Sequence, residues 1–320
     1  MALRDVPVFV GFIIRYTLSL VQHLANADST SVASEIISHP LSPTRRAFLK
    51  SSGTAMLGTT FGAPLISALL TSHEYTIRRV PLIFPNLPTG LNGLTIAQLS
   101  DVHSGVYMTE KQIFEIVELV NALHPNIIIH TGDHVDNADN QIPSIVAPTR
   151  SLKADYGVFG VLGNHDHFAT AEKVSAALGQ TGMQLLNNAN RLLTINGERL
   201  SIVGVDDFSR TNNFARLEDA VRGVKPDSFK LFLSHRPEFF DAARTKTDFD
   251  LMLAGHTHGG QVGFEAFGLK VYPVYLVHKY AMGYYQVDDK QLYVNVGVGM
   301  VGAPIRYVPA EITIFTLQQA

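Results

Sequence analysis

Short apolar runs separated by polar loops recur from residue 94 onward and predict the strands of a sheet. Residues 94–100, 126–130 and 157–162 are nearly continuous in hydrophobic side chains, which is typical of strands buried on both faces. Later runs of similar character cover residues 192–195, 200–205, 230–234, 251–254, 292–296 and 312–317. The second half of the chain is therefore expected to be rich in β-structure.

Helical periodicity appears between these runs. Residues 109–123 are expected to form a helix, because Thr109 followed three residues later by Gln112 is typical of a helix start. The apolar stripe of this helix consists of Ile113, Ile116, Val117 and Val120. Shorter helices are expected over residues 170–178 and 238–244. Strands alternating with helices first, and strands dominating later, predict a layered α/β domain with mixed sheets.

The folded domain is expected to span residues 75–320. At its start, Pro81, Pro85 and Pro88 predict an irregular lead-in rather than a regular element. Residues 1–74 are expected to be an N-terminal extension.

Polar side chains gather where five of the apolar runs end. The endings are Ser100-Asp101-Val102-His103, Thr131-Gly132-Asp133, Gly163-Asn164-His165-Asp166, Leu233-Ser234-His235 and Gly255-His256-Thr257-His258. Sites in α/β sheets lie at the carboxyl ends of strands, so five such endings predict one shared site.

The segment G-H-T-H-G-G-Q, residues 255–261, is the densest of these endings. Residues two apart in an extended segment point the same way, so His256 and His258 can reach a common centre. The glycines allow the backbone to approach a ligand closely. This segment alone leaves two interpretations open, a metal-binding loop and a surface turn.

Composition limits which partners and which metal ligands the chain can have. The chain has 320 residues, a formal net charge of −3 and no cysteine. A strongly basic surface for nucleic acid is therefore not indicated, and no nucleic-acid partner is expected. Any metal must use His, Asp, Asn or Glu ligands, because thiolate ligands are excluded.

Residues 44–50, T-R-R-A-F-L-K, look like a twin-arginine export signal. An uncharged segment with many small residues follows over 51–70 and suits the apolar region of a signal peptide. We therefore expect export by the twin-arginine machinery to the periplasm or the outer face of the cytoplasmic membrane. If the signal is not cleaved, residues 51–70 would remain as a membrane anchor.

Residues 6–21 form a second apolar run near the N-terminus. The run is short for a bilayer span and contains Arg15 near its middle, which is costly inside a membrane. An interfacial helix, a poor first span and an extension upstream of the true start all remain open.

Taken in order, the motifs D-x-H, G-D, G-N-H-D, a lone histidine and G-H-T-H resemble the calcineurin-like metallophosphoesterase superfamily over about residues 94–317. The resemblance implies a four-layer αββα sandwich with mixed sheets. The form G-H-T-H-G-G-Q and the later A-P-I-R-Y-V-P-A-E-I resemble a bacterial branch of twin-arginine-exported or membrane-associated phosphodiesterases. That branch includes relatives that cleave the pyrophosphate of UDP-diacylglucosamine.

The resemblance also implies two divalent cations, Mn, Zn or Fe. The implied ligands of one cation are Asp101, His103 and His258, and those of the other are Asn164, His235 and His256. Asp133 would bridge them. The residue types agree with this, because a carboxylate can bridge two cations about 4 Å apart, and imidazole with carboxylate suits these metals.

The implied activity is metal-assisted hydrolysis of a phosphoester, most simply a phosphodiester that is lipid-linked or cell-wall-linked. His165 would stabilise the transition state or protonate the leaving oxygen, and Asp166 would orient or charge His165. Arg236 and Arg306 are candidates for binding phosphate, with a structural salt bridge as the alternative for either. Two other functions remain open: a UDP-lipid pyrophosphatase facing the cytoplasm, and a non-catalytic scaffold with the same fold.

Overall fold

The computed structural model describes residues 75–320 apart from residues 209–212, 267–268 and 303–305. The twin-arginine motif, residues 51–70 and residues 6–21 lie outside the described residues. The expectations of a signal, an anchor and a domain boundary at residue 75 therefore stay predictions.

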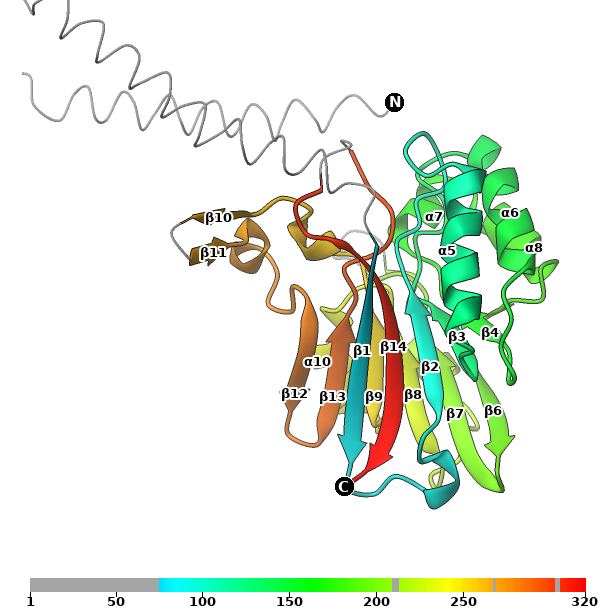
Figure 1. Cartoon of the computed structure of the whole chain (residues 1–320). Coiled ribbons are helices and arrows are strands. Elements are labelled where there is room, and N and C mark those ends of the chain that lie inside the picture. Colours follow the sequence, from blue (N-terminus) through cyan, green and yellow to red (C-terminus); the bar gives the residue numbers. More distant parts are fainter. Residues whose placement is uncertain (1–74, 209–212, 267–268, 303–305) are drawn as a thin grey trace, which may run out of the picture. The chain divides into compact units, whose positions relative to one another are not determined.

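Two six-stranded sheets pack face to face in the described domain (Figure 1). The first sheet has the order β1–β14–β2–β3–β4–β5, with the bounds Tyr75–Phe84, Ala310–Gln319, Thr95–Leu99, Ile127–His130, Val158–Gly160 and Gln184–Leu185. The second has the order β12–β13–β9–β8–β7–β6, with the bounds Gly283–Val287, Lys290–Val294, Leu251–Ala254, Phe229–Leu233, Glu198–Gly204 and Ala189–Ile195. A separate hairpin pairs β10 (Phe264–Ala266) with β11 (Leu269–Val271).

Helices form the two outer layers. The α-helices of the described residues are α5 (Glu110–Ala122), α6 (Ile142–Arg150), α7 (Asn164–Phe168), α8 (Ala171–Gly179), α9 (Leu217–Ala220) and α10 (Phe239–Lys246). The 3-10 helices η2 (Thr89–Leu91), η3 (Asp139–Gln141), η4 (His258–Gly260) and η5 (Pro273–Leu276) lie in the loops. None of the helices in the described part of the chain is long and apolar enough to cross a membrane.

Three buried hydrophobic clusters fill the spaces between four layers, which confirms the predicted αββα sandwich. One lies between the sheets, one joins the first sheet to α5, α6 and α8, and one joins the second sheet to α9 and α10. Within β3, Ile127 and Ile129 belong to the cluster between the sheets, whereas Ile128 faces the helices. This alternation explains why the strands read as continuous apolar runs, since both of their faces are buried.

Most of the predicted elements are present. Helix α5 begins after Thr109, whose side chain accepts from the Gln112 amide, while the Gln112 side chain accepts from the Thr109 amide. The sequence prediction of this cap is thus confirmed.

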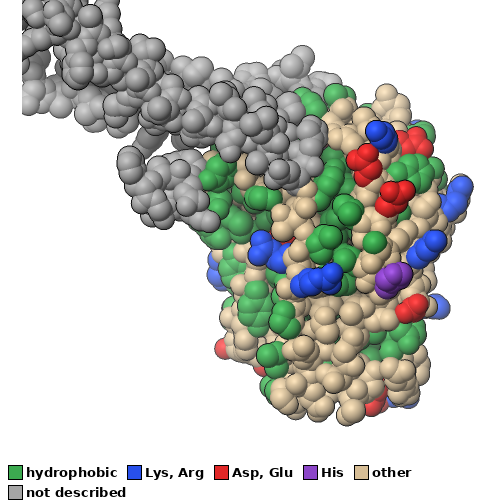
Figure 2. All heavy atoms as spheres, in the orientation of Figure 1, with side chains coloured by type: hydrophobic (Ala, Val, Ile, Leu, Met, Phe, Trp, Pro, Cys, Tyr) green, Lys and Arg blue, Asp and Glu red, His purple; other side chains and the backbone are tan. Residues whose placement is uncertain are grey.

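The prediction of an irregular segment at the start of the domain was wrong, because residues 75–84 form strand β1. β1 pairs only with β14 and is an edge strand, where Pro81 can lack an N–H without breaking a ladder on both sides. The face that carries β1 and β14 mixes hydrophobic side chains with a few Lys and Arg side chains (Figure 2). Arg78 on β1 donates to Glu311 at 2.9 Å, and such charges on an edge discourage pairing with another chain.

Strand direction decides where the loops meet. β2, β3 and β4 run parallel to one another, as do β7, β8, β9 and β13, whereas β14 runs antiparallel to β2. We call the edge at which β2–β4 and β7–β9 end the carboxyl edge. β1 runs parallel to β14, so β1 begins at this same edge, with Tyr75 opposite Ala310.

Candidate metal centre

The seven predicted metal ligands all lie at the carboxyl edge, in the segments that follow buried strands, and two of them, Asn164 and His258, begin α7 and η4. β2 is followed by Asp101 and His103, β3 by Asp133, β4 by Asn164, β8 by His235, and β9 by His256 and His258. Main-chain bonds tie these loops together. The His103 amide donates to the Asp133 carbonyl at 3.0 Å, and the His256 amide donates to the Asp101 carboxylate at 3.1 Å.

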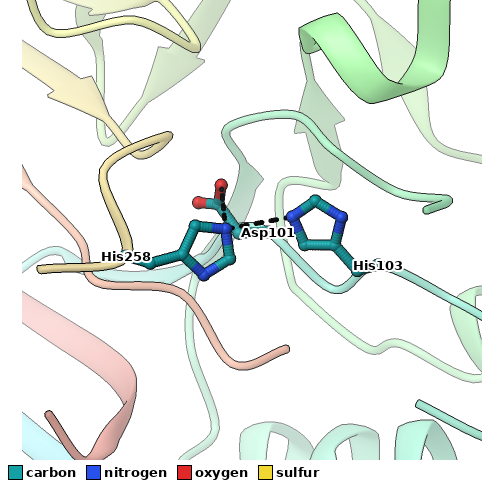
Figure 3. Close-up of side chains that lie close together, drawn as sticks. All are labelled: Asp101, His103 and His258. Atoms are coloured by element: carbon teal, nitrogen blue, oxygen red, sulfur yellow. Dashed lines mark hydrogen bonds and ion pairs between the residues drawn. The ribbon is translucent and has the colours of Figure 1, made fainter. Parts of the chain in front are cut away.

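A first group of side chains converges from the ends of β2 and β9 (Figure 3). His258 Nε2 lies 3.3 Å from Asp101 Oδ1 and 3.0 Å from His103 Nε2. All three side chains are almost completely buried. Ligand atoms bound at about 2.0–2.2 Å to one cation lie about 3 Å from one another, so this spacing fits a metal site.

A second group lies beside the first. His235 Nε2 lies 3.2 Å from each of three atoms, namely Asn164 Oδ1, Asp133 Oδ2 and His256 Nδ1. His256 therefore belongs to the second group and His258 to the first, although one residue separates them. One turn of the G-H-T-H segment supplies both groups, as expected from the sequence.

Asp133 connects the two groups. Its Oδ2 lies 3.2 Å from His235 Nε2 in the second group and 3.6 Å from His103 Nε2 in the first. A single carboxylate placed between two sets of nitrogen and oxygen ligands is the arrangement that a bridging ligand needs. The residues therefore fit a centre for two divalent cations.

The backbone at this centre adopts uncommon conformations. Positive φ angles occur at five of the seven ligands, with values of 53° at Asp101, 48° at His103, 55° at Asp133, 74° at His256 and 52° at His258. Such residues cost about 1–3 kcal/mol each and cluster at functional sites. The turns at the strand ends are thus shaped for the side chains to converge, at the expense of folding stability.

Two glycines allow the loops to come this close. A Cβ on Gly163 would collide with the Asp133 carboxylate, and one on Gly255 would collide with Ser100 and Asp101. Any larger residue at either position would displace a ligand. The glycine before His256 is therefore needed for close approach, as the sequence predicted.

Burial keeps three of the histidines neutral. It lowers the pKa of His103 to about 3, and it lowers the pKa values of His256 and His258 well below the usual range. A neutral imidazole offers a lone pair to a metal ion, whereas a protonated one does not.

Charge is balanced differently at the bridging position. Burial favours the protonated form of Asp133, but the surrounding imidazoles, above all His235, hold its pKa well below the usual range. Burial also favours the neutral form of His235 and by itself would lower its pKa. The Asp133 carboxylate outweighs burial and raises the pKa of His235 to about 10. The carboxylates of this pocket thus stabilise positive charge, which agrees with a site for cations.

His165 lies at the side of the first group, outside the seven ligands. Its ring is 4.6 Å from the ring of His103, and its amide donates to Asp133 at 2.8 Å. Its Nδ1 contacts the backbone carbonyl of Asp136 and lies 3.7 Å from the Asp136 carboxylate. The sequence interpretation missed Asp136, although a second carboxylate three residues after Asp133 in the same loop was an available signal.

The contacts of Asp166 differ from the expected ones. Asp166 is fully buried and its carboxylate contacts His134 Nδ1 at 3.0 Å, not the ring of His165. The amides of His134, Val135 and Gly163 also donate to it. Asp166 therefore ties the loop after β3 to the loop after β4, and Asp136 occupies the place beside His165 that was predicted for it.

The two candidate phosphate-binding arginines differ from each other. Arg306 is fully buried, and its guanidinium donates to the backbone carbonyls of Val296, Gly297, Gly299 and Val308. These contacts favour a structural role for Arg306 over phosphate binding. The role differs from the predicted salt bridge, because the partners are backbone carbonyls. Arg236 lies at the centre itself, where Nε donates to Asp207 at 2.8 Å and Nη1 lies 2.7 Å from His256 Nε2.

Comparison with known proteins agrees with this geometry. The chain is 31% identical over 294 residues to the uncharacterized metallophosphoesterase YkuE of Bacillus subtilis, covering 86% of this chain and 97% of that one. It is 27% identical to an uncharacterized metallophosphoesterase of Aquifex aeolicus, covering 81% and 98%. It is 30% identical to a bovine transmembrane protein with a metallophosphoesterase domain, covering 88% of this chain but 65% of that one.

The sequence model of the family described as calcineurin-like phosphoesterase matches residues 94–260, just over half of the chain. This span contains every residue of both ligand groups, from Asp101 to His258. The chain belongs to the calcineurin-like phosphoesterase family.

Proposed function

We propose that this protein is a dinuclear metal-dependent phosphodiesterase. The observation that supports it most directly is the position of Asp133 Oδ2 between two complete groups of buried ligand atoms. When bound, the two cations would polarise the phosphoryl oxygens and lower the pKa of a coordinated water so that it can act as the nucleophile.

His165 is proposed as the proton donor to the leaving oxygen. Its ring stands next to His103 with 18% of the side chain exposed, so it borders both the metal ligands and solvent. Asp136 holds Nδ1 through its backbone carbonyl and carboxylate, which leaves the other ring nitrogen for substrate. Replacing His165 by Ala should lower turnover by orders of magnitude, and turnover within about threefold of wild type would contradict this role.

Arg236 is proposed to bind the substrate phosphate once metal is present. In the described structure its Nη1 donates to His256 Nε2, which requires a lone pair on that nitrogen. A neutral imidazole that gives Nδ1 to a cation carries its proton on Nε2, so the two arrangements exclude each other. Metal binding would thus release Nη1 for phosphate, while the bond from Nε to Asp207 keeps the side chain in place.

We extend the proposal to the cellular location of the protein and to the exported branch of the family. The twin arginines Arg45 and Arg46 and the uncharged residues 51–70 support export through the twin-arginine route, with action on a substrate linked to lipid or cell wall. A reporter fused after residue 75 should reach the periplasm only while Arg45 and Arg46 are intact. Retention of the reporter in the cytoplasm would favour a pyrophosphatase acting on a UDP-linked lipid there.

The test of the reaction is hydrolysis by the purified full chain, stripped of metal and reloaded with Mn, Zn, Fe or Mg. Bis-p-nitrophenyl phosphate is compared with p-nitrophenyl phosphate, and Asp133→Asn is compared with the matched control Asp227→Asn on an exposed loop. We expect metal-dependent cleavage of the diester that only Asp133→Asn abolishes. A folded chain that binds no metal and cleaves neither ester would instead support the non-catalytic scaffold.

A further inference from the structure

Exposed apolar side chains lie near the metal centre. Seven large hydrophobic residues with at least 40% exposure lie at the carboxyl edge, in the connections that follow β2, β4, β7, β9 and β11, including α7 and η5. We call them the apolar rim, and they are Val106, Phe168, Phe214, Val262, Tyr275, Leu276 and Val277. The rim includes the four most exposed large hydrophobic residues of the described chain, led by Leu276 at 90% and Val106 at 80%.

The rim reaches the centre from two sides. On one side the Phe168 ring lies 5.0 Å from the ring of His165, and Phe214 stacks on His167 at 4.1 Å. On the other side Val277 precedes His278, whose ring is 5.9 Å from that of the ligand His256. A molecule whose phosphate lies at the metal ligands would therefore have its adjoining groups next to apolar surface.

Exposed apolar residues gathered at one edge are unfavourable in water and mark a surface that contacts something apolar. The sequence that leads into β1 favours a lipid bilayer. Tyr75, the first residue of β1, lies at the carboxyl edge, opposite Ala310. Only residues 71–74 separate it from the uncharged residues 51–70, and four residues reach at most about 14 Å. If residues 51–70 anchor the chain, they hold the carboxyl edge close to the membrane.

We propose that the apolar rim contacts the surface of a lipid bilayer, with Tyr275, Leu276 and Val277 inserted at the interface. The metal centre then opens toward the membrane and takes a phosphoester that carries an apolar chain. Contact of the rim with the bilayer is independent of catalysis, whereas the class of substrate rests on the proposed function. The rim would place the apolar part of such a substrate beside the centre.

The absence of cysteine makes a direct test possible, because one introduced cysteine is the only labelling site. Nitroxide labels at Leu276→Cys and Val106→Cys are compared with a label at Ile83→Cys in the full chain. Ile83 is a matched control, since it is 55% exposed and lies near the other end of β1. The protein is reconstituted into vesicles of phosphatidylethanolamine and phosphatidylglycerol, and accessibility to oxygen and to a water-soluble nickel chelate is measured.

We expect both rim labels to gain access to oxygen and lose access to the nickel chelate, while the control label stays exposed to the chelate. Rim labels as accessible to the chelate as the control would overturn the inference. Dipolar broadening between rim labels would also overturn it, because a second copy of the chain would then cover the rim.

The substrate is tested separately with Leu276→Ser/Val277→Ser and the control Ile83→Ser. The rim variant should cleave soluble bis-p-nitrophenyl phosphate as wild type does, and cleave the p-nitrophenyl ester of phosphatidic acid in vesicles about tenfold more slowly. Equal rates on the lipid diester, or cleavage of the soluble diester only, would overturn the lipid substrate. Failure of wild type on both diesters would remove the proposed function and leave the label result standing.

Discussion

The metal centre and the apolar rim share one edge of the sandwich and have opposite compositions. At the centre, carboxylates and imidazoles such as Asp101, Asp133 and His235 are buried to within 1% of full burial. At the rim, Leu276 and Val106 are almost fully exposed. Each reverses the usual distribution of side chains, in which charges face water and large apolar groups are buried. Both regions therefore reduce the stability of the isolated chain, and each is explained by a different kind of ligand.

The two regions also differ in how they are held. Main-chain bonds between loops, positive φ angles and glycines that leave no room for a Cβ position the predicted ligands of the centre. Rim side chains are instead exposed, as are those of Leu276 in η5 and Val106 after β2. A metal ion demands defined distances, whereas a lipid surface demands only apolar area, so the precision of each region matches its proposed ligand.

The substitution with the largest expected effect should damage the metal centre and leave the apolar rim unchanged. Asp133→Asn should lower turnover of a soluble diester about a thousandfold or more, because the bridge between the two ligand groups loses its charge. Metal analysis should show fewer than two ions per chain, while a label at Leu276→Cys should report the same membrane contact as before. A parallel loss of membrane contact would mean that the centre and the rim are not independent.

A smaller loss is expected at Asp136, whose carboxylate lies 3.7 Å from Nδ1 of both His165 and His103. Asp136→Asn should lower the turnover number about 10- to 100-fold, because the carboxylate supports the proposed proton donor and a predicted metal ligand without being one of the seven predicted ligands. The matched control is Asp139→Asn, three residues later, whose carboxylate contacts Thr170 and Lys173 instead. If Asp139→Asn were as damaging, a general effect on the loop would replace this explanation.

Substitution of Arg306 tests whether this buried arginine beside the centre has a structural role. Arg306→Met should lower the free energy of unfolding by about 2–4 kcal/mol, because several loop carbonyls lose their donor. Arg199→Met, which breaks an exposed pair with Asp227, should cost less than about 1 kcal/mol in the same denaturation experiment. A raised KM for the diester at unchanged stability would instead return Arg306 to substrate binding.

The smallest effect concerns His167, which connects the rim to the centre. Burial lowers its pKa, but the hydrogen bond of its Nε2 to Asp206 at 2.8 Å outweighs burial and raises the pKa above 6.5. A raised pKa in the folded state stabilises the protein below pH 6.5, and this contribution is lost as the pH rises through the folded value. In Asp206→Asn the burial remains and this carboxylate is lost, so an NMR titration should show the pKa of His167 lowered relative to the wild-type protein. An unchanged titration would show that Asp206 is not the cause.

Much of the centre could be predicted because its signals are local. A polar residue directly after a buried run marks a strand end, and five such endings contain all seven predicted ligands, which the structure brings together in two groups. The start of α5 was also predictable, since Thr109 and Gln112 satisfy each other within one helical turn. β1 was not, because Pro81 is compatible with a strand only at a sheet edge, and being an edge depends on the partner strand β14 at the far end of the chain.

The sequence by itself determined the elements, the ligand types and the family resemblance, since residue periodicity and spacing are properties of neighbouring residues. Only the tertiary structure decided that Asp136 lies beside His165, that Asp166 contacts His134, that Arg306 is bound to loop carbonyls and that rim residues such as Phe168 lie beside the centre. These contacts join different loops, and small backbone rotations at strand ends redirect a side chain completely. Their partners are therefore set by how two sheets and their loops pack in space, which no local pattern records.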